Sequence, residues 1–362
     1  MRCPIHLNDV EKLLPDKLMQ TEIATTDTEV NTNDTVRRAV SMLQSGEVVA
    51  LPTETVYGLA ADALDPVAVE KIFEAKGRPH FDPLIVHIPH KTMLYEIASI
   101  PEEIAKTVVQ LTETFWPGAL TLVLPRKPVI PDIVTGGLPT VAVRQCMHPI
   151  FHRIARNFGR PIAAPSANMF GLLSPTSSQA VVDQLDGRIP LIVDGGACSQ
   201  GLESTIIRIE ATDKKPLIHV LRPGPITEID LKKFGKVVFE AKNTDVENSS
   251  PEAPGMLANH YAPNTPLRLL ERPQDFSPKE GKRYALLSYR GQKKDGYLDL
   301  HEWEEISILS PGSGRVAEAG IRFFHLMRQL DLLGVDEIIA EPVPDRAAGK
   351  AILDKLRKAA VK

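Results

Sequence analysis

Short apolar runs alternate with segments of helical spacing along residues 34–224, and this alternation restricts the fold more than any other feature. The run 48–51 ends at Pro52 and suits a buried strand. Asp65-Pro66 then predicts a helix start, because an Asp cap followed by Pro is typical of that position. Strands alternating with helices predict an α/β domain, and strands that follow one another without a helix predict a mixed sheet in place of a purely parallel one. The other expected strands are 84–88, 120–124, 140–143, 191–193, 205–209 and 218–221.

Three further regions flank or follow this domain. Residues 1–33 are polar and predict an N-terminal extension, part of it disordered, before a helix capped by Asp34. Residues 225–265 are rich in Pro, Asn and Ser and are longer than an ordinary connection, as linkers and lids are. A second alternation predicts a smaller, doubly wound (Rossmann-like) domain over 266–362. Its expected strands are 284–289, 306–309 and 337–340, and its expected helices are 314–332 and 346–359.

Composition excludes several classes of protein. The net charge is −4, so wholesale wrapping by nucleic acid is not expected. Cys3, Cys146 and Cys198 are far apart and form no CxxC pair, which favours a reducing compartment over a disulfide framework or a zinc site. No run approaches the ~20 apolar residues that span a bilayer. We therefore expect a cytoplasmic protein without membrane association.

Two segments place polar or basic side chains at the end of a strand or helix. PTETVYGL places Thr53, Glu54, Thr55 and Tyr57 in a turn after a strand, where hydroxyl groups can hold a small polar ligand; a solvated turn is the alternative. In KGRP, Lys76 and Arg78 flank a glycine that allows close approach, and together they can neutralise phosphate oxygens. A helix C-terminus also attracts cations for structural reasons alone.

A third segment and several strand ends add to this set. In PSAN, Ser166 and Asn168 follow a short apolar run, and a helix start follows, which suits a phosphate or a carboxylate; a helix-capping loop is the alternative. Arg144, Ser204 and Arg222 also lie at strand ends. Together these residues predict a basic, hydroxyl-lined cleft. The sequence lacks GxxxxGK[ST], GxSxG and HExxH, so it matches neither a P-loop enzyme nor these hydrolase classes.

The motifs PTETVYGL, KGRP, PSAN, STII and LRPG, in this order, resemble the YrdC-like threonylcarbamoyl-AMP synthase family. SPEAPGMLANHYAP and the domain after it resemble the linker and the C-terminal domain of its long, two-domain members. The resemblance implies an L-threonylcarbamoyladenylate synthase, a nucleotidyltransferase that uses ATP, L-threonine and bicarbonate and releases pyrophosphate. Its product would serve threonylcarbamoyladenosine formation next to the anticodon of tRNAs. Mg²⁺ is expected on ATP and not at a dedicated protein site.

The resemblance also implies roles for individual residues. Catalytic roles are implied for Lys76, Arg78, Ser166 and Asn168. The implied threonine site comprises Thr55, His87, Arg144, Ala164 and Ser204. The implied ATP site comprises Arg78, Asp82, Thr140, Ser166, Ser174, Arg222, Tyr261 and His260. Asp82 stands where the family often has Asn, and its carboxylate would repel a phosphate unless magnesium intervened.

Two other functions fit parts of the pattern. A double-stranded RNA or tRNA-binding module without adenylation activity would use the same basic face, although the acidic net charge argues against it. A carbamoyl-transfer domain is the other, but the hydrogenase-maturation proteins that contain one also carry cysteine-rich or acylphosphatase-like modules that this sequence lacks. For a synthase, we expect hand-off of the product to a threonylcarbamoyl-transferase complex acting on tRNA, with at most weak RNA contact.

Overall fold

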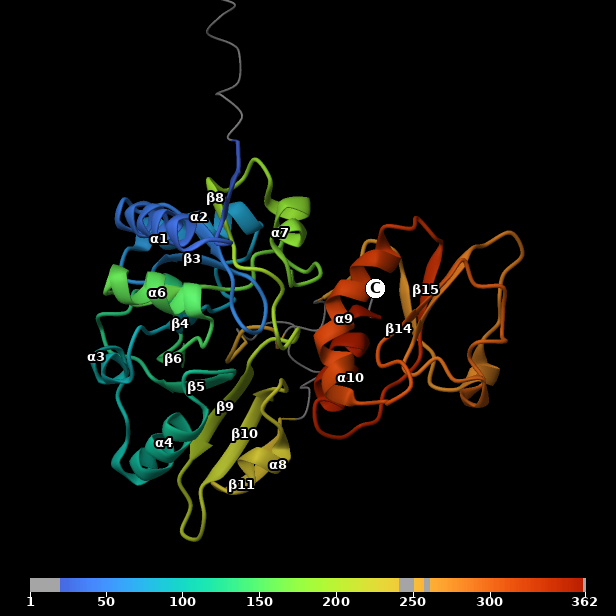
Figure 1. Cartoon of the computed structure of the whole chain (residues 1–362). Coiled ribbons are helices and arrows are strands. Elements are labelled where there is room, and N and C mark those ends of the chain that lie inside the picture. The colour runs from blue at the N-terminus through green and yellow to red at the C-terminus, as the bar shows by residue number, and fades with distance from the viewer. Residues whose placement is uncertain (1–19, 241–250, 257–260, 361–362) are drawn as a thin grey trace, which may run out of the picture.

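The chain forms two α/β units in the computed structural model, which describes residues 20–240, 251–256 and 261–360 (Figure 1). The larger unit is built on an eleven-stranded sheet, and the C-terminal unit on a four-stranded sheet. The larger sheet has the order β1 (Glu22–Thr25), β8 (Leu191–Asp194), β2 (Val49–Leu51), β3 (Gly58–Asp62), β7 (Ile162–Ala163), β4 (Ile85–His87), β6 (Thr140–Arg144), β5 (Leu120–Pro125), β9 (Thr205–Glu210), β10 (Leu217–Arg222) and β11 (Lys236–Phe239).

The pairing confirms the expected mixed sheet. β4 runs parallel to β6, whereas β5 runs antiparallel to β6. The neighbours β2 and β3, and also β9 and β10, are antiparallel pairs joined without a helix. The helices of this unit are α1 (Glu29–Gln44), α2 (Pro66–Lys76), α3 (Leu94–Ile97), α4 (Glu102–Phe115), α5 (Asp132–Thr135), α6 (Pro149–Phe158), α7 (Ser178–Leu185) and α8 (Glu228–Leu231).

Alternation along the strands divides the core into two faces. Val49 and Leu51 of β2 pack with α1 and α6, whereas Ala50 packs with α2 and α7. Side chains of successive strand residues point to opposite faces, so a fully apolar strand requires helices on both sides. The result is a layered α/β unit whose strand ends lie between helical layers.

Helix α2 shows how local sequence places the KGRP segment. Asp65 accepts a hydrogen bond from the Val67 amide and Pro66 occupies the first turn, as predicted. The helix ends at Gly77, which adopts the left-handed conformation (φ 60°) that side chains other than glycine rarely adopt. Arg78 therefore leaves the helix at a sharp turn that directs the chain back towards the sheet.

The N-terminal region differs from the prediction over residues 20–33. β1 pairs in parallel with β8, and the following helix is capped by Thr28, whose hydroxyl accepts from the Asn31 amide. The expected cap, Asp34, lies inside α1. Thr32 and Thr35 are buried in this helix, so the polar composition concealed a packed segment. Residues 1–19 lie outside the described part of the chain.

The sheet also extends past the boundary expected at residue 224. β11 pairs in parallel with β10 and places Lys236–Phe239 in the larger sheet, although the sequence suggested a linker there. Four residues with exposed or half-buried side chains give a weak pattern, because an edge strand has one paired side only.

The C-terminal unit is built on a small parallel sheet, as expected, but its described α-helices cover one face of the sheet and not both, as a doubly wound arrangement would. Its strands have the order β12 (Leu267–Leu269), β15 (Glu337–Ala340), β13 (Tyr284–Ser288) and β14 (Glu305–Ile308). Helices α9 (Val316–Asp331) and α10 (Gly349–Ala359) lie on the side that faces the larger unit (Figure 1). The opposite face of the sheet packs against loop side chains, including Tyr297 and Trp303.

The two units share one apolar cluster. Val56, Leu173 and Leu202 of the larger unit and Tyr261 of the connecting segment belong to the cluster formed mainly by α9, α10 and their sheet. The backbone of Ile321 comes so close to Gly201 that a Cβ there would lie 2.3 Å from its carbonyl oxygen. The interface is thus a packed core and not a loose contact between domains.

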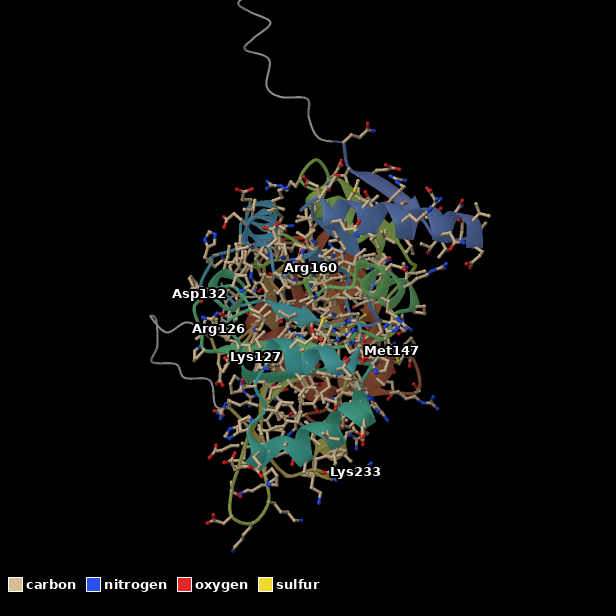
Figure 2. The ribbon with its side chains drawn as sticks, turned by 90° about the vertical axis from the view of Figure 1, so that its left-hand side faces the viewer. Arg126, Lys127, Asp132, Met147, Arg160 and Lys233 are labelled. Atoms are coloured by element: carbon tan, nitrogen blue, oxygen red, sulfur yellow. The ribbon has the colours of Figure 1, made fainter. Side chains whose placement is uncertain are left out.

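The face of the larger unit turned away from the C-terminal unit carries exposed charges of both signs (Figure 2). Arg126 pairs with Asp132, and Arg160 forms a 2.8 Å ion pair with Asp62. Lys127 donates to the Tyr95 carbonyl oxygen. Arg126, Lys127 and Arg160 therefore already have acceptors on this face. Among the described residues, every helix is too short or too polar to cross a lipid bilayer.

Candidate active site

A pocket forms where the three motif segments meet the ends of β6, β9 and β10. It holds about 490 Å³ of space between atoms, part of it open to solvent. Its lining comes from segments up to 200 residues apart in the chain: Thr53, Thr55, Val56, Tyr57, Gly58, Arg78, Ile85, His87, Arg144, Ala164, Pro165, Ser166, Glu203, Ser204, Arg222, Pro254 and Gly255. Eight residues predicted for the site are thereby brought together: Thr55, Arg78, His87, Arg144, Ala164, Ser166, Ser204 and Arg222.

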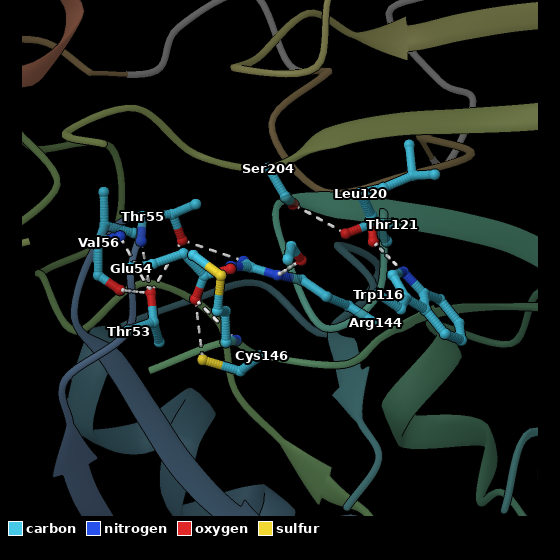
Figure 3. Close-up of polar contacts among 12 residues, drawn as sticks. Thr53, Glu54, Thr55, Val56, Trp116, Leu120, Thr121, Arg144, Cys146 and Ser204 are labelled. Carbon is cyan, nitrogen blue, oxygen red and sulfur yellow. Dashed lines mark hydrogen bonds and ion pairs between the residues drawn. The ribbon is translucent and has the colours of Figure 1, made fainter. Parts of the chain in front are cut away.

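The PTET turn is held by its own hydroxyl groups (Figure 3). Thr53 Oγ1 accepts from the amides of Thr55 and Val56 at 3.0 and 3.2 Å and lies 2.8 Å from Thr55 Oγ1. Gly58 forms an isolated bridge with Ser166, so this turn and the PSAN segment lie side by side. A Cβ at Gly58 would stand 3.3 Å from Ala164 Cβ, which explains the glycine at this close approach.

Arg144 is fixed by three groups before any substrate binds. It forms a buried ion pair with Glu54, donates to Thr55 Oγ1 at 3.0 Å and donates to the Gly118 carbonyl oxygen at 3.0 Å (Figure 3). Burial alone would raise the pKa of Glu54, but the Arg144 charge and hydrogen bonds, including one from Cys146 Sγ, outweigh it and lower the pKa to about 2. Because a guanidinium has five N–H groups, Arg144 retains donors for a carboxylate.

Ser204 and Arg222 form a second polar group in the pocket lining. Ser204 Oγ lies 2.8 Å from Thr121 Oγ1 and accepts from Arg222 Nη2 at 3.0 Å. Arg222 Nη1 also donates to the Pro254 carbonyl oxygen at 3.4 Å, which brings the connecting segment to the pocket edge. This group therefore combines one cation with two hydroxyl groups.

Arg78 enters the pocket with its own acidic partner. Its Nη2 lies 2.8 Å from Asp82 Oδ2, and the same nitrogen donates to the Pro83 carbonyl oxygen at 2.8 Å. Burial raises the pKa of Asp82 and the charge of Arg78 opposes that rise. Asp82 does not line the pocket, whereas Arg78, to which its carboxylate is paired, does.

Lys76 and Asn168 do not line the pocket. Their side chains donate hydrogen bonds to backbone carbonyl oxygens in and after the PSAN segment. Lys76 Nζ donates to the carbonyl oxygens of Ser166 and Asn168 at 2.6 and 2.5 Å. Burial, and next the neighbouring charge of Arg78, lower the pKa of Lys76. Asn168 Nδ2 donates to the carbonyl oxygens of Met169 and Leu172. The spacing rules that identified both residues could not indicate which way their side chains point.

His87 and Thr140 lie on the paired strands β4 and β6, but only His87 lines the pocket. His87 lines the pocket and packs at 4.8 Å against the Phe151 ring, and burial followed by the charge of Arg144 lowers its pKa to about 3. The imidazole is therefore neutral at physiological pH. Thr140 lies at the far end of β6 from Arg144 and is not among the lining residues.

Ser174 and Tyr261 reach the site through Glu203. Ser174 Oγ donates to Glu203 Oε1 at 2.8 Å. Tyr261 is fully buried, and its pKa is raised by burial and then by the nearby Glu203 carboxylate. Neither lines the pocket, whereas Pro254 and Gly255 of the same connecting segment do. His260, expected beside ATP, lies outside the described residues.

Sequence reasoning did not assign Glu54 or Glu203 to the site. Both are acids directly next to a predicted site hydroxyl, Thr55 or Ser204, and that adjacency was the available signal. Their burial, at 2 and 4 % exposure, is what distinguishes them from surface acids. Within residues 20–240, 251–256 and 261–360, no three histidine, cysteine or carboxylate side chains gather where they could bind a metal ion.

Both units match family models of known proteins. The Sua5/YciO/YrdC family model, described as "Telomere recombination", matches residues 41–224, and the model "Threonylcarbamoyl-AMP synthase, C-terminal domain" matches residues 226–361. The threonylcarbamoyl-AMP synthase of Pyrococcus abyssi is 40 % identical, over 90 % of this chain and 93 % of its own. That of Bacillus subtilis is 42 % identical over 92 % of this chain and 95 % of its own.

A solved structure agrees in fold. The crystal structure of P. abyssi Sua5 complexed with L-threonine superposes with a TM-score of 0.79 and 36 % identity, covering 94 % of this chain and 97 % of that one. The match includes the C-terminal unit as well as the larger one. By sequence and by fold, the chain belongs to the threonylcarbamoyl-AMP synthase family, in its long form with a Sua5 C-terminal domain.

Proposed function

We propose that this protein forms L-threonylcarbamoyladenylate from ATP, L-threonine and bicarbonate. The observation that supports this most directly is the convergence of Arg78, Arg144 and Arg222 with the hydroxyl groups of Thr55, Ser166 and Ser204 on one pocket. Three guanidinium groups suit an anionic substrate pair, because arginine binds both carboxylate and phosphate bidentately.

The reaction requires no enzyme nucleophile. The threonine amine adds to bicarbonate and water leaves, which gives a carbamate. A carbamate oxygen then attacks the α-phosphorus of ATP, and the bond to the bridging oxygen of pyrophosphate breaks. Negative charge accumulates on the phosphates and the leaving group, so fixed cations and donors around them accelerate the step. A pocket lined by arginine and hydroxyl groups without a nucleophile–base pair is consistent with this chemistry.

Within the pocket, the arginines divide between the two substrates. Arg144 retains N–H groups beside Thr55 and suits the threonine carboxylate. The neutral His87 imidazole lies on the same side and can accept or donate a hydrogen bond without adding charge. Arg78 and Arg222 then face the nucleotide, with the backbone and hydroxyl of Ser166 beside the reacting groups.

Magnesium would enter bound to the triphosphate. The nearby acids Asp82, Glu54 and Glu203 each pair with a cation of the protein, so they do not form a separate metal site. Mg²⁺ commonly binds through substrate phosphates and water with few protein ligands, and when bound it neutralises phosphate charge. The residues present fit that mode.

The product is a mixed anhydride and requires an acceptor. We propose that a threonylcarbamoyl-transferase complex receives it and modifies the adenosine next to the anticodon of tRNAs, in the cytoplasm. Direct RNA binding by this chain is not required by such a hand-off. Any RNA contact would be weak, since the acidic net charge of −4 opposes it.

The test is product formation from purified protein. Pyrophosphate release should require both L-threonine and bicarbonate, and mass spectrometry should detect threonylcarbamoyl-AMP. Omitting either co-substrate should leave only background ATP hydrolysis. A protein that binds tRNA in a salt-dependent manner but makes no adenylate under these conditions would contradict the proposal and support an RNA-binding module.

A further inference from the structure

Helix α10 of the C-terminal unit inserts a lysine next to the pocket wall of the larger unit. Lys355 is fully buried, and its Nζ lies 2.9 Å from Glu203 Oε2. The same ammonium group lies 4.8 Å from the centre of the Tyr261 ring. The ion pair thus joins a pocket-lining residue of one unit to the core of the other.

Glu203 occupies a position where an unpaired carboxylate would disturb the site. It lines the pocket, and the next residue, Ser204, accepts hydrogen bonds from Arg222. Its other oxygen accepts from Ser174. A buried carboxylate without a counter-ion would repel nucleotide phosphates or attract Arg222 away from them, because charge interactions are strong where water is excluded.

Each of the three acids close to the pocket forms an ion pair, but the three cations do not all come from the same unit. Asp82 pairs with Arg78 and Glu54 pairs with Arg144, so both have partners from the larger unit. Glu203 forms its ion pair with Lys355 of the C-terminal unit, while Lys76 of the larger unit interacts with the same carboxylate through its charge alone. The positive charge available to ATP therefore depends on the docking of that unit.

A second buried lysine of α10 reaches the same wall. Lys358 Nζ donates to the carbonyl oxygen of Gly255, which lines the pocket. By contrast, Lys350 of the same helix pairs at 2.9 Å with Glu228, is 31 % exposed and contacts no residue of this pocket. The buried lysines of α10 thus contact pocket-lining residues, whereas the half-buried Lys350 joins the two units through Glu228.

We infer that Lys355 is a positioning residue for the ATP side of the pocket, which neutralises Glu203 and so leaves Arg222 to the nucleotide. This inference rests on the proposed function, because it assigns ATP to that side. It gives the C-terminal unit an electrostatic role in the site in addition to its packing role. Threonine binding should depend on this lysine much less, because the Arg144 guanidinium is held by Glu54, Thr55 and Gly118 and not by Glu203.

Lys355→Met tests the inference, since methionine keeps the length and apolar stem but removes the charge. The dissociation constant for ATP, measured by titration calorimetry on the full chain, should rise about 10- to 100-fold, the usual size of coupling between sites. The dissociation constant for L-threonine should rise less than threefold. Lys350→Met is the matched control and should alter neither constant, although it removes an ion pair from the same helix and interface.

A double variant separates charge from packing. Lys355→Met/Glu203→Gln removes both charges and should recover much of the ATP affinity lost in Lys355→Met, giving a non-additive cycle. Equal losses in Lys355→Met and Lys350→Met, normal ATP affinity in a folded Lys355→Met, or additive effects in the double variant would each overturn the inference. If Lys355→Met is too unstable to titrate, the double variant is compared with the wild type: ATP affinity close to that of the wild type supports the inference, and a loss of 10-fold or more overturns it.

The same measurements distinguish the two proposals. Wild-type protein that binds ATP but makes no threonylcarbamoyl-AMP would overturn the proposed function, while the binding cycle would still report on Lys355. Normal synthesis together with unaltered ATP affinity in Lys355→Met would overturn this inference alone. Wild-type protein that binds no ATP would overturn both.

Discussion

Glu54 forms a buried ion pair with Arg144, so the arginine proposed for the threonine carboxylate also has an acidic partner within the protein. Glu54 also accepts from Cys146 Sγ at 3.0 Å and from the Met147 amide at 3.2 Å. These bonds lock the carboxylate, and the carboxylate in turn orients the guanidinium. Such preorganisation lowers the entropy that substrate binding would otherwise cost.

Glu54→Gln should therefore weaken both stability and threonine binding. Removing one partner of a buried pair destabilises by about 3–5 kcal/mol, and a looser Arg144 should raise the threonine KM roughly tenfold. Chemical unfolding and steady-state kinetics measure the two effects. Glu47→Gln is the control: it removes a partly exposed pair with Lys71 and should change stability by about 0.5 kcal/mol or less. Equal effects in the two variants would contradict the assignment.

Arg78→Ala should lower kcat/KM by about 10²- to 10³-fold, because a preorganised cation is lost from the developing phosphate charge. It also leaves Asp82 buried and unpaired, so part of the loss could reflect folding. Arg78→Ala/Asp82→Asn removes that complication: it should regain thermal stability but not pyrophosphate release. Activity that returns together with stability would show that Arg78 acts on the fold and not on the substrate.

Stability should fall as the pH is lowered below 6.5 because of His87. Its pKa falls from 6.5 to about 3 on folding, so the unfolded chain binds the proton first. The stabilisation is complete above pH 6.5 and is lost progressively as the pH falls towards 3, at up to about 1.4 kcal/mol per pH unit. Urea unfolding between pH 7 and pH 4.5 should show this slope in the wild type. His87→Gln should flatten it, and an identical slope in both proteins would refute the burial argument.

Gly255→Ala should impair ATP binding. A Cβ at Gly255 would stand 2.6 Å from Tyr261 Oη and 3.1 Å from Arg222 Cδ, and the backbone φ is +79°. We expect a loss of roughly 2–4 kcal/mol from strain and overpacking, with an increased KM for ATP as Arg222 shifts. Gly281→Ala is a close match, because its φ is +76° with nothing within 4 Å. It should show the backbone strain alone, with unchanged kinetics.

Sequence patterns located secondary structure well where either apolar burial or helix capping alone determined the element. Apolar runs predicted β5, β8 and β10, and cap chemistry predicted the start of α2, because burial and capping act locally. The helix at Glu29–Gln44 was placed too late because threonines occupy buried positions in it, and β11 was missed because an edge strand has little apolar pattern.

The candidate site shows a similar limit. The motifs brought the correct segments together, since strand ends and tight turns determine where a backbone goes. They could not tell Arg78, which lines the pocket, from Lys76, which donates to backbone carbonyls behind it. Nor could they reveal that Glu203 meets a lysine about 150 residues later in the chain, because that contact depends on how two units dock.

The apolar cluster shared by the two units has a calorimetric consequence. Leu173 and Leu202 complete a core that also contains Phe323 and Leu356, so unfolding the C-terminal unit alone would expose apolar surface of the larger one to water. Unfolding of either unit therefore lowers the stability of the other. A heating scan of the intact chain should give a single endotherm, with one heat-capacity step, in place of two resolved transitions.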